Sequence, residues 1–158
     1  MGEQDTYVVE RQAHMAAPPE RVRERIVDLR RWESWSPWED LDPEVQRTYG
    51  GPGAGEGAWY AWEGNRKAGK GRMEITEVTD LGVTIGLQFI KPFKSTSTNR
   101  FTLQPRETGT LVTWTLTGPK TFMTKVMGVF TSMDEMLGGD FEKGLANLKA
   151  EVEADTAA

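Results

Sequence analysis

The feature that most constrains this chain is a change in the spacing of its apolar residues. Between residues 44 and 118 apolar and polar side chains alternate, whereas the spacing before and after this stretch is helical. Alternation over short segments separated by glycine and other turn residues is typical of antiparallel strands that bury one face. We therefore predict six consecutive strands, over residues 44–49, 58–64, 69–78, 82–90, 95–105 and 110–118.

Three elements are predicted before this stretch. Residues 7–17 begin with β-branched side chains and form a first strand, which ends at a pair of prolines. A helix is expected from Pro19 onward, because proline suits the first helical turn and the apolar residues that follow lie on one face. Residues 32–38 form a second, short helix, which ends where Pro37 pushes the preceding residue out of helical geometry.

The last 40 residues return to helical spacing, with two apolar stripes separated by Gly138-Gly139. We predict a long C-terminal helix that bends or is interrupted at the glycines, and a segment 130–137 that moves to admit a ligand. The tail, residues 154–158, is expected to be disordered. The stripes are Met123, Val126, Met127, Phe130, Met133 and Leu137, followed by Phe141, Leu145, Leu148 and Val152.

Composition excludes several classes of protein. The 158 residues fit one domain, and a net charge of −5 argues against nucleic acid as a partner. The chain has no cysteine and one histidine, so we expect neither a zinc or iron site nor another cofactor. No segment is apolar enough to span a membrane and no signal peptide is recognisable, so we expect a cytoplasmic protein without membrane insertion.

A curved antiparallel sheet with an apolar concave face needs a cover. Only the C-terminal helix is long and apolar enough to provide it. This predicts an α+β fold of about seven strands, in the order strand, two helices, six strands, helix, with the sheet wrapped around the last helix. We expect a ligand cavity between sheet and helix, because side chains do not completely fill a strongly curved trough.

The sequence also resembles a known family. It is similar to the START/Bet v1-like (SRPBCC) superfamily, and within it to the bacterial polyketide cyclase/dehydrase branch. This resemblance implies a single helix-grip domain over residues 1–158, in a family that includes lipid carriers, ligand-sequestering proteins and a few enzymes. The similar segments are WESWSPWEDLDPE (32–44), GAWYAWEGNRKAGKGRMEI (57–75), LVTWTLTG (111–118) and GGDFEKGLANLK (138–149).

Candidate ligand contacts lie on the apolar phase of the strands and on the last helix. The resemblance favours Tyr60 and Trp62 as an inward pair. Their O–H and N–H groups need hydrogen-bond partners when buried, and Ser97 and Asn99 are the candidates. The alternative to ligand contact is that these polar groups bond only to one another in a filled core. The helix methionines suit variable apolar ligands, but core packing also explains each of them. The predicted ligand-binding residues are Trp35, Tyr60, Trp62, Met73, Leu87, Phe89, Ser97, Asn99, Phe101, Trp114, Met127, Phe130, Met133 and Leu137.

Three other features have simple interpretations. The segment GNRKAGKG (64–71) nearly matches a phosphate-binding loop, but Gly71 stands where a hydroxyl should hold magnesium, and the segment joins two strands, so we interpret it as a hairpin. The glycine-rich segment 50–57 is interpreted as a flexible loop that could gate a pocket. His14 could act as a general base, but we interpret it as a surface histidine.

The three tryptophans of residues 32–38 have acidic neighbours. Base stacking requires a cationic groove, and membrane anchors usually have basic neighbours, so neither role fits. We interpret Trp32 and Trp35 as a wall that closes one end of the sheet, with Trp38 packing near the loop after Pro37.

We predict that the protein binds an apolar or aromatic small molecule, such as a lipid, a polyketide or an isoprenoid-like compound, as a carrier or sequestering protein. Burial of about 25 cal/mol per Å² of apolar surface would drive binding. The alternative is a cyclase or dehydratase for polyketide-like substrates, with Tyr60 and His14 as the only candidate acid–base groups. A third hypothesis is a ligand-free interaction module, a homodimer formed through Trp59 on the outer face of the sheet.

Overall fold

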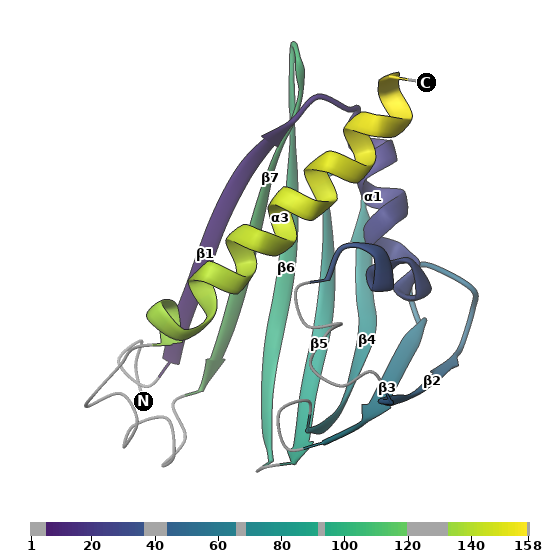
Figure 1. The fold of residues 1–158 in the computed structure, drawn as a ribbon, viewed down its shortest axis with the longest axis vertical. Helices are drawn as coiled ribbons and strands as arrows, with labels where there is room; N and C mark the ends of the chain where they lie inside the picture. Colours follow the sequence, from purple (N-terminus) through teal and green to yellow (C-terminus); the bar gives the residue numbers. More distant parts are fainter. Residues whose placement is uncertain (1–5, 37–43, 66–68, 92–93, 120–132, 158) are drawn as a thin grey trace.

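The computed structural model describes residues 6–36, 44–65, 69–91, 94–119 and 133–157 (Figure 1). These contain one antiparallel sheet in the strand order β1-β7-β6-β5-β4-β3-β2, together with helices α1 and α3 and a short 3₁₀ helix, η2. The elements are β1 (Thr6–Met15), α1 (Pro19–Val27), η2 (Leu29–Ser34), β2 (Gln46–Gly50), β3 (Trp59–Glu63), β4 (Lys70–Thr79), β5 (Gly82–Lys91), β6 (Ser95–Arg106), β7 (Gly109–Pro119) and α3 (Met133–Ala157).

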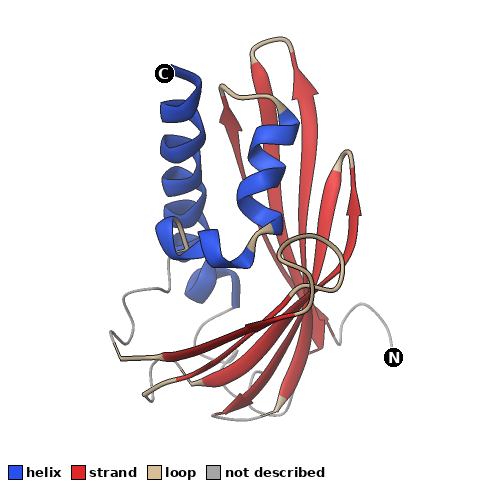
Figure 2. Ribbon diagram, turned by 90° about the vertical axis from the view of Figure 1, so that its right-hand side faces the viewer, coloured by secondary structure: helices blue, strands red, loops and turns tan. Residues whose placement is uncertain are grey.

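The sheet is strongly curved, and the described helices all lie on its concave side (Figure 2). Helix α3 crosses this side next to β1, and α1 packs against α3 (Figure 1). At the end of the molecule away from α1, the strands extend beyond the helices (Figure 2). The predicted seven-strand helix-grip architecture and its element order are therefore confirmed.

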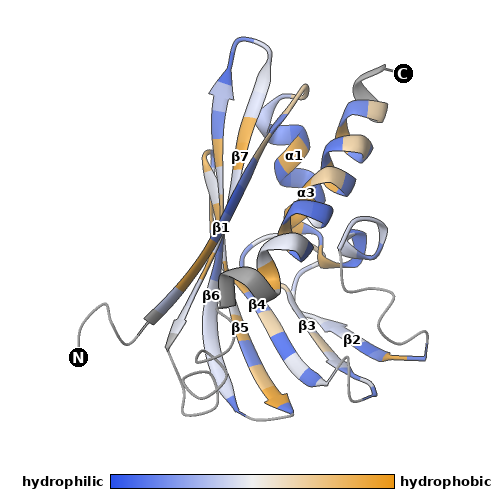
Figure 3. Cartoon of the chain, turned by 60° about the vertical axis from the view of Figure 1, so that its left-hand side comes forward, coloured by the Kyte–Doolittle hydropathy of each residue, from blue (hydrophilic) through white to orange (hydrophobic). Residues whose placement is uncertain are grey.

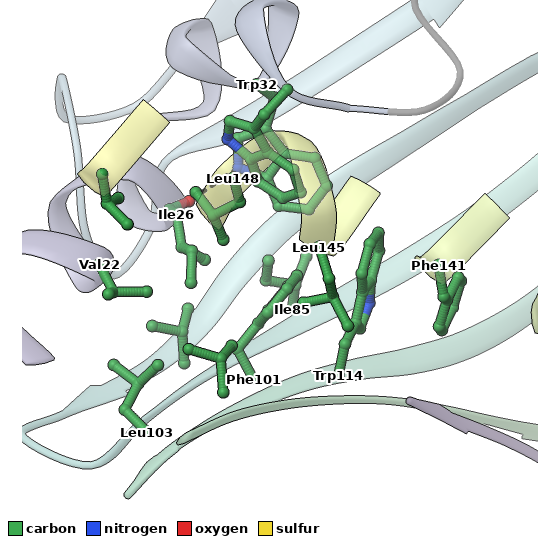
Figure 4. Close-up of a cluster of buried hydrophobic side chains, with 14 of the residues drawn as sticks. Val22, Ile26, Trp32, Ile85, Phe101, Leu103, Trp114, Phe141, Leu145 and Leu148 are labelled. Carbon is green, nitrogen blue, oxygen red and sulfur yellow. Dashed lines mark hydrogen bonds between the residues drawn. The ribbon is translucent and has the colours of Figure 1, made fainter. Parts of the chain in front are cut away.

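An aromatic core fills the space between the helices and the middle of the sheet (Figure 4). It consists of Trp32 from η2, Trp35 directly after η2, Phe101 from β6, Trp114 from β7 and Phe141 from α3, each at most 5% exposed. The Trp114 ring stacks on Phe141 with ring centroids 4.1 Å apart, and on Phe101 at 4.8 Å. Trp32 and Trp35, themselves 4.6 Å apart, meet the Phe101 and Trp114 rings edge-on.

The indole N–H groups of the three tryptophans form hydrogen bonds within this core. Burying these side chains therefore does not carry the cost of an unsatisfied donor. Each indole N–H donates to an oxygen of a neighbouring residue: Trp32 to the Ile26 carbonyl at 2.9 Å, Trp35 to the Arg25 carbonyl at 3.2 Å, and Trp114 to Oδ1 of Asn99 at 2.9 Å.

Polar contacts from α3 hold α1 and η2 in place over the core. The Glu151 carboxylate accepts from Nε of Arg25 at 3.0 Å and from the Ser34 hydroxyl at 2.8 Å. The Asn147 amide donates to the Trp35 carbonyl at 3.2 Å, so one face of α3 contacts both preceding helices. These bonds orient the helices, whereas the aromatic core supplies most of the buried apolar surface.

Helix α3 runs without interruption through Gly138-Gly139, so the expected break does not occur. Gly138 is buried, and a Cβ there would meet the guanidinium of Arg11 on β1, whereas a Cβ at Gly139 would meet open space. Nε of Arg11 donates to Glu142 at 2.9 Å, one turn further along α3. Gly138 therefore allows the close approach of Arg11 to the helix.

The two glycines should respond differently to alanine. Gly139→Ala should raise the free energy of unfolding by about 1 kcal/mol, because alanine favours the helix and has space there. Gly138→Ala should give no gain, or a loss, because its methyl group must displace Arg11 from Glu142. Chemical denaturation of both variants measures the difference. Equal stabilisation by both would show that Arg11 does not need the gap at Gly138.

Candidate functional site

Beyond the core, the concave face carries four aromatic side chains that are only partly buried. We call Tyr49, Tyr60, Trp62 and Phe89 the aromatic band. Tyr49 and Tyr60 have ring centroids 5.1 Å apart, Tyr60 stacks on Trp62 at 5.8 Å, and Trp62 meets Phe89 edge-on at 5.6 Å. Aromatic rings in mutual contact that still reach solvent form a ready apolar binding surface.

Strand register explains why these rings lie together. One row of paired positions crosses the sheet through Tyr49, Tyr60, Met73, Leu87 and Ser97. The next row, further from the core, contains Arg47, Trp62, Gly71 and Phe89. Because side chains alternate across a strand, both rows face the same side as the buried Ile75 and Ile85. The end of β5 that carries Phe89 is hydrophobic in Figure 3.

Glycines let two aromatic rings lie across the concave face. A Cβ at Gly71 would be 2.5 Å from the Trp62 ring, and a Cβ at Gly118 would be 2.7 Å from the Tyr7 hydroxyl. Each glycine therefore faces a ring from the neighbouring strand, an arrangement that any side chain at the glycine would obstruct. The Trp62 ring is placed in the band for this reason.

The Tyr7 hydroxyl is a polar group at the β1 end of the row that contains Tyr60, Leu87 and Ser97. Its hydroxyl hydrogen-bonds with the Ser97 side chain, across Gly118. Burial raises the pKa of the Tyr7 phenol above its ordinary value, and the Ser97 hydrogen bond opposes this shift only in part. Tyr7 is therefore a neutral hydroxyl at neutral pH, able to donate or accept a hydrogen bond.

The expected partners of Tyr60 and Trp62 are engaged elsewhere. Asn99 is 4% exposed and accepts from Trp114, and Ser97 bonds with Tyr7. Alternation places Asn99 and Ser97 on the correct face, but it does not reveal that Trp114 and Tyr7 reach them across the sheet.

A positively charged rim borders the band at the β2 edge. Arg47 pairs in register with Trp62, and its Nη1 lies 3.4 Å from the Glu33 carboxylate of η2. The Arg30 guanidinium, also from η2, lies 4.6 Å from the centre of the Tyr49 ring, within the range of a cation–π interaction. These contacts connect η2 to the outer part of the sheet.

The predicted ligand-binding residues fall into three groups. Trp35, Asn99, Phe101 and Trp114 are buried in the core; Tyr60, Trp62, Met73, Leu87, Phe89 and Ser97 lie on the two outer rows; and Leu137 of α3 packs partly buried against the core. Met127, Phe130 and the Met133 side chain lie outside the described part of the chain, as do Pro37, Trp38 and residues 130–132 of the segment predicted to move.

Sequence reasoning missed Tyr7, Arg30, Arg47 and Tyr49. Tyr7 could have been found, because it shares the inward phase of β1 with the buried Val9. Arg47 and Tyr49 likewise alternate with exposed residues on β2. Arg30 carries no such signal, because its position depends on how η2 packs against the sheet.

The three remaining sequence features lie apart from the band. In segment 64–71, the Gly64 amide donates to the Gly69 carbonyl at 2.9 Å between β3 and β4, which confirms a hairpin. The segment 50–57 is anchored, because Gly55 donates to the Val27 carbonyl and Gly57 to the Ile75 carbonyl. His14 is exposed, with Nε2 3.0 Å from the Thr108 hydroxyl.

The described residues contain no group of three or more His, Asp or Glu side chains placed to hold a metal ion. None of their helices combines the length and the apolar character needed to cross a membrane.

The Tyr7 phenol should ionise above the ordinary tyrosine pKa of about 10. The difference between alkaline absorbance titrations of the wild type and Tyr7→Phe isolates this group. The folded protein holds the Tyr7 proton more tightly than the unfolded chain does. The contribution of this group to the free energy of unfolding is therefore fully present below about pH 10, and it is lost as the pH rises through the folded-state pKa. A Tyr7 phenol that titrates at or below the ordinary value would contradict its burial.

Comparison with known proteins gives a consistent picture. The family described as "Polyketide cyclase / dehydrase and lipid transport" matches residues 6–153. No curated protein matches the chain.

Several solved structures share the fold. A protein from Nitrosospira multiformis is 19% identical with a TM-score of 0.65, covering 96% of this chain and 100% of its own. DynU16, from the dynemicin biosynthetic locus, is 17% identical with a TM-score of 0.62, covering 92% of this chain and 47% of its own. The Aha1 dimer from Colwellia psychrerythraea is 16% identical with a TM-score of 0.61, covering 93% of this chain and 96% of its own.

Proposed function

Because the chain belongs to the polyketide cyclase/dehydrase and lipid transport family, we propose that it binds an apolar or aromatic small molecule against the aromatic band. A lipid, a polyketide or an isoprenoid-like compound fits this description. The observation that carries the proposal is the set of four partly buried rings, in mutual contact, on the concave face of the sheet.

Binding would be driven by burial of the surface that these rings still expose. Apolar surface removed from water contributes about 25 cal/mol per Å², and stacking on aromatic rings adds to this. Leu87 lies between the buried Met73 and the Ser97 position in the same row, so an apolar body that reaches Leu87 from the rings of β3 would find contacts on more than one strand. The Tyr7–Ser97 pair would orient one polar group of the ligand.

The inner rings have a different role in this proposal. Trp35, Phe101 and Trp114 are at most 1% exposed and contact one another, so they would support the site from behind rather than touch the ligand. Asn99 would act with them, because its side-chain oxygen already accepts from Trp114.

A carrier or sequestering protein fits the described groups better than a cyclase or dehydratase. An acid–base catalyst works best with a pKa near the working pH. The phenol of Tyr7 has a raised pKa and an uncharged partner, Ser97, so it suits hydrogen bonding more than proton transfer. His14 lies on the opposite face of β1 from the inward Tyr7 and Val9.

The proposal includes a diffusible ligand and a cytoplasmic location, which the net charge of −5 supports because it opposes adsorption to anionic lipid surfaces. A homodimer through Trp59 has less support. The Trp59 ring lies against the Gly50 position and the Arg72 guanidinium, 4.7 Å from the ring centre, so it already packs within its own sheet.

Binding can be tested with N-phenylnaphthylamine, an uncharged apolar dye. The folded wild type should bind it with enhanced, blue-shifted emission. Trp62→Ala and Phe89→Ala should each weaken binding about tenfold, which is the cost of losing one large aromatic contact. Fluorescence titration measures the affinity, and circular dichroism verifies the fold of each variant.

The matched control is Trp59→Ala, which removes the same ring from the same strand but from the opposite face. It should leave the dye affinity unchanged. Equal losses in Trp59→Ala and Trp62→Ala, or dye binding by partly unfolded protein alone, would contradict a site on the aromatic band.

A further inference from the structure

We propose that the ligand is an amphipathic anion, whose acidic headgroup binds Arg47 and Arg30 at the β2 edge while its apolar body lies on the aromatic band. This inference rests on the proposed function, since it specifies the chemical class of the ligand for the same site. The headgroup could be a carboxylate, a sulfonate or a phosphate ester, which share the negative charge that a guanidinium recognises.

Arg47 is placed at the border between apolar surface and solvent. It lies opposite Trp62 in the outer row, and its side chain is 21% exposed. Most of its aliphatic stem and head are therefore shielded, so its charge acts in a medium less polar than bulk water. A hydrogen bond from a guanidinium in such a setting is stronger than one on a fully solvated side chain.

Arg30 adds a second positive charge on the same edge. Its guanidinium lies over the Tyr49 ring, the first ring of the band, and Tyr49 is two residues along β2 from Arg47. The two arginines thus approach the band from different elements, η2 and β2. An acid that lies along the rings from Phe89 toward Tyr49 would reach this edge with its headgroup.

Glu33 shows that Arg47 accepts a carboxylate in this place. Its Oε1 lies 3.4 Å from Nη1 of Arg47 in an ion pair, and its side chain is 53% exposed. An ion pair with so exposed a carboxylate contributes little to folding stability, and the Glu33 side chain can rotate away into the solvent. A ligand headgroup could therefore exchange with Glu33 or share the guanidinium with it.

The charge distribution along the rest of the band is consistent with binding of an anionic headgroup at Arg47. Apart from Arg47, the described residues of the two rows are apolar, glycine or hydroxyl-bearing, so the rows themselves present no competing carboxylate. Glu63, at the end of β3, belongs to the opposite phase from Trp62 and lies 3.8 Å from Lys70.

The test compares two dyes with the same body and different charge. Anilinonaphthalene sulfonate carries a sulfonate on the skeleton of N-phenylnaphthylamine, which has none. The measured quantity is the affinity of each dye for the wild type and three variants, by fluorescence titration at low and high salt. The uncharged dye reports the apolar site, and the ratio of the two affinities reports the headgroup site.

Arg47→Met retains an apolar stem and removes the charge. It should weaken sulfonate binding about tenfold, the value expected for a hydrogen bond to a charged group, and leave the uncharged dye unaffected. The control is Arg100→Met, because Arg100 lies on the opposite face with the same 3.4 Å separation from a carboxylate, that of Glu77. It should change neither affinity.

Glu33→Gln separates anion binding from a structural role of the ion pair. If the Arg47–Glu33 pair merely held η2 on the sheet, losing either partner would change binding in the same direction. If Arg47 binds the headgroup, Glu33→Gln should strengthen sulfonate binding, by about threefold, because a competing carboxylate is removed. High salt should reduce the difference between wild type and variants.

The outcomes are distinct. Opposite effects of Arg47→Met and Glu33→Gln on the sulfonate dye alone support the headgroup site. Equal effects on both dyes, or an unchanged affinity ratio in Arg47→Met, would overturn it while leaving the apolar site in place. Failure of the wild type to bind the uncharged dye would overturn the proposed function itself.

Discussion

The structure depends on the stacking of Trp114 between Phe101 and Phe141. This contact joins β7, β6 and α3 at a single ring, and the edges of Trp32 and Trp35 close on the same rings from η2. Large aromatic rings bury more apolar surface than any aliphatic side chain, so this cluster determines where the helices lie on the sheet. The polar bonds of Glu151 and Asn147 then select the orientation of α1 and η2.

A filled core in the middle of the sheet shifts the candidate site outward. The rows that carry Tyr60, Trp62, Leu87 and Phe89 lie beyond the core, and their side chains retain partial exposure. The tryptophans divide accordingly: Trp32, Trp35 and Trp114 are buried in the core, Trp62 belongs to the proposed binding surface, and Trp59 lies on the outer face of the sheet. The same residue type therefore serves three purposes, according to its distance from α3 and the face that it occupies.

The site has an apolar centre with different polar groups at its two sides. The Tyr7–Ser97 hydroxyls lie at the β1 side, and the two arginines with Glu33 lie at the β2 side. An elongated molecule with unlike ends would match this polarity better than a symmetric hydrocarbon. Such an arrangement fits the proposed binding of a small molecule, because an apolar surface with a few polar groups at its sides can both bury a ligand and orient it.

The sequence by itself determined the strands, their inward faces and the helical cover, because apolar alternation and helical spacing are local patterns. It therefore placed Leu87 and Phe89 on the concave face correctly, and the family resemblance did the same for Tyr60 and Trp62. Only the tertiary structure decided that Trp35 and Phe101 are enclosed while Trp62 is not, that Ser97 meets Tyr7, and that Gly138 admits Arg11. These contacts and burials depend on the curvature of the sheet and on the positions of α3 and η2. Contacts between residues far apart in the chain determine both.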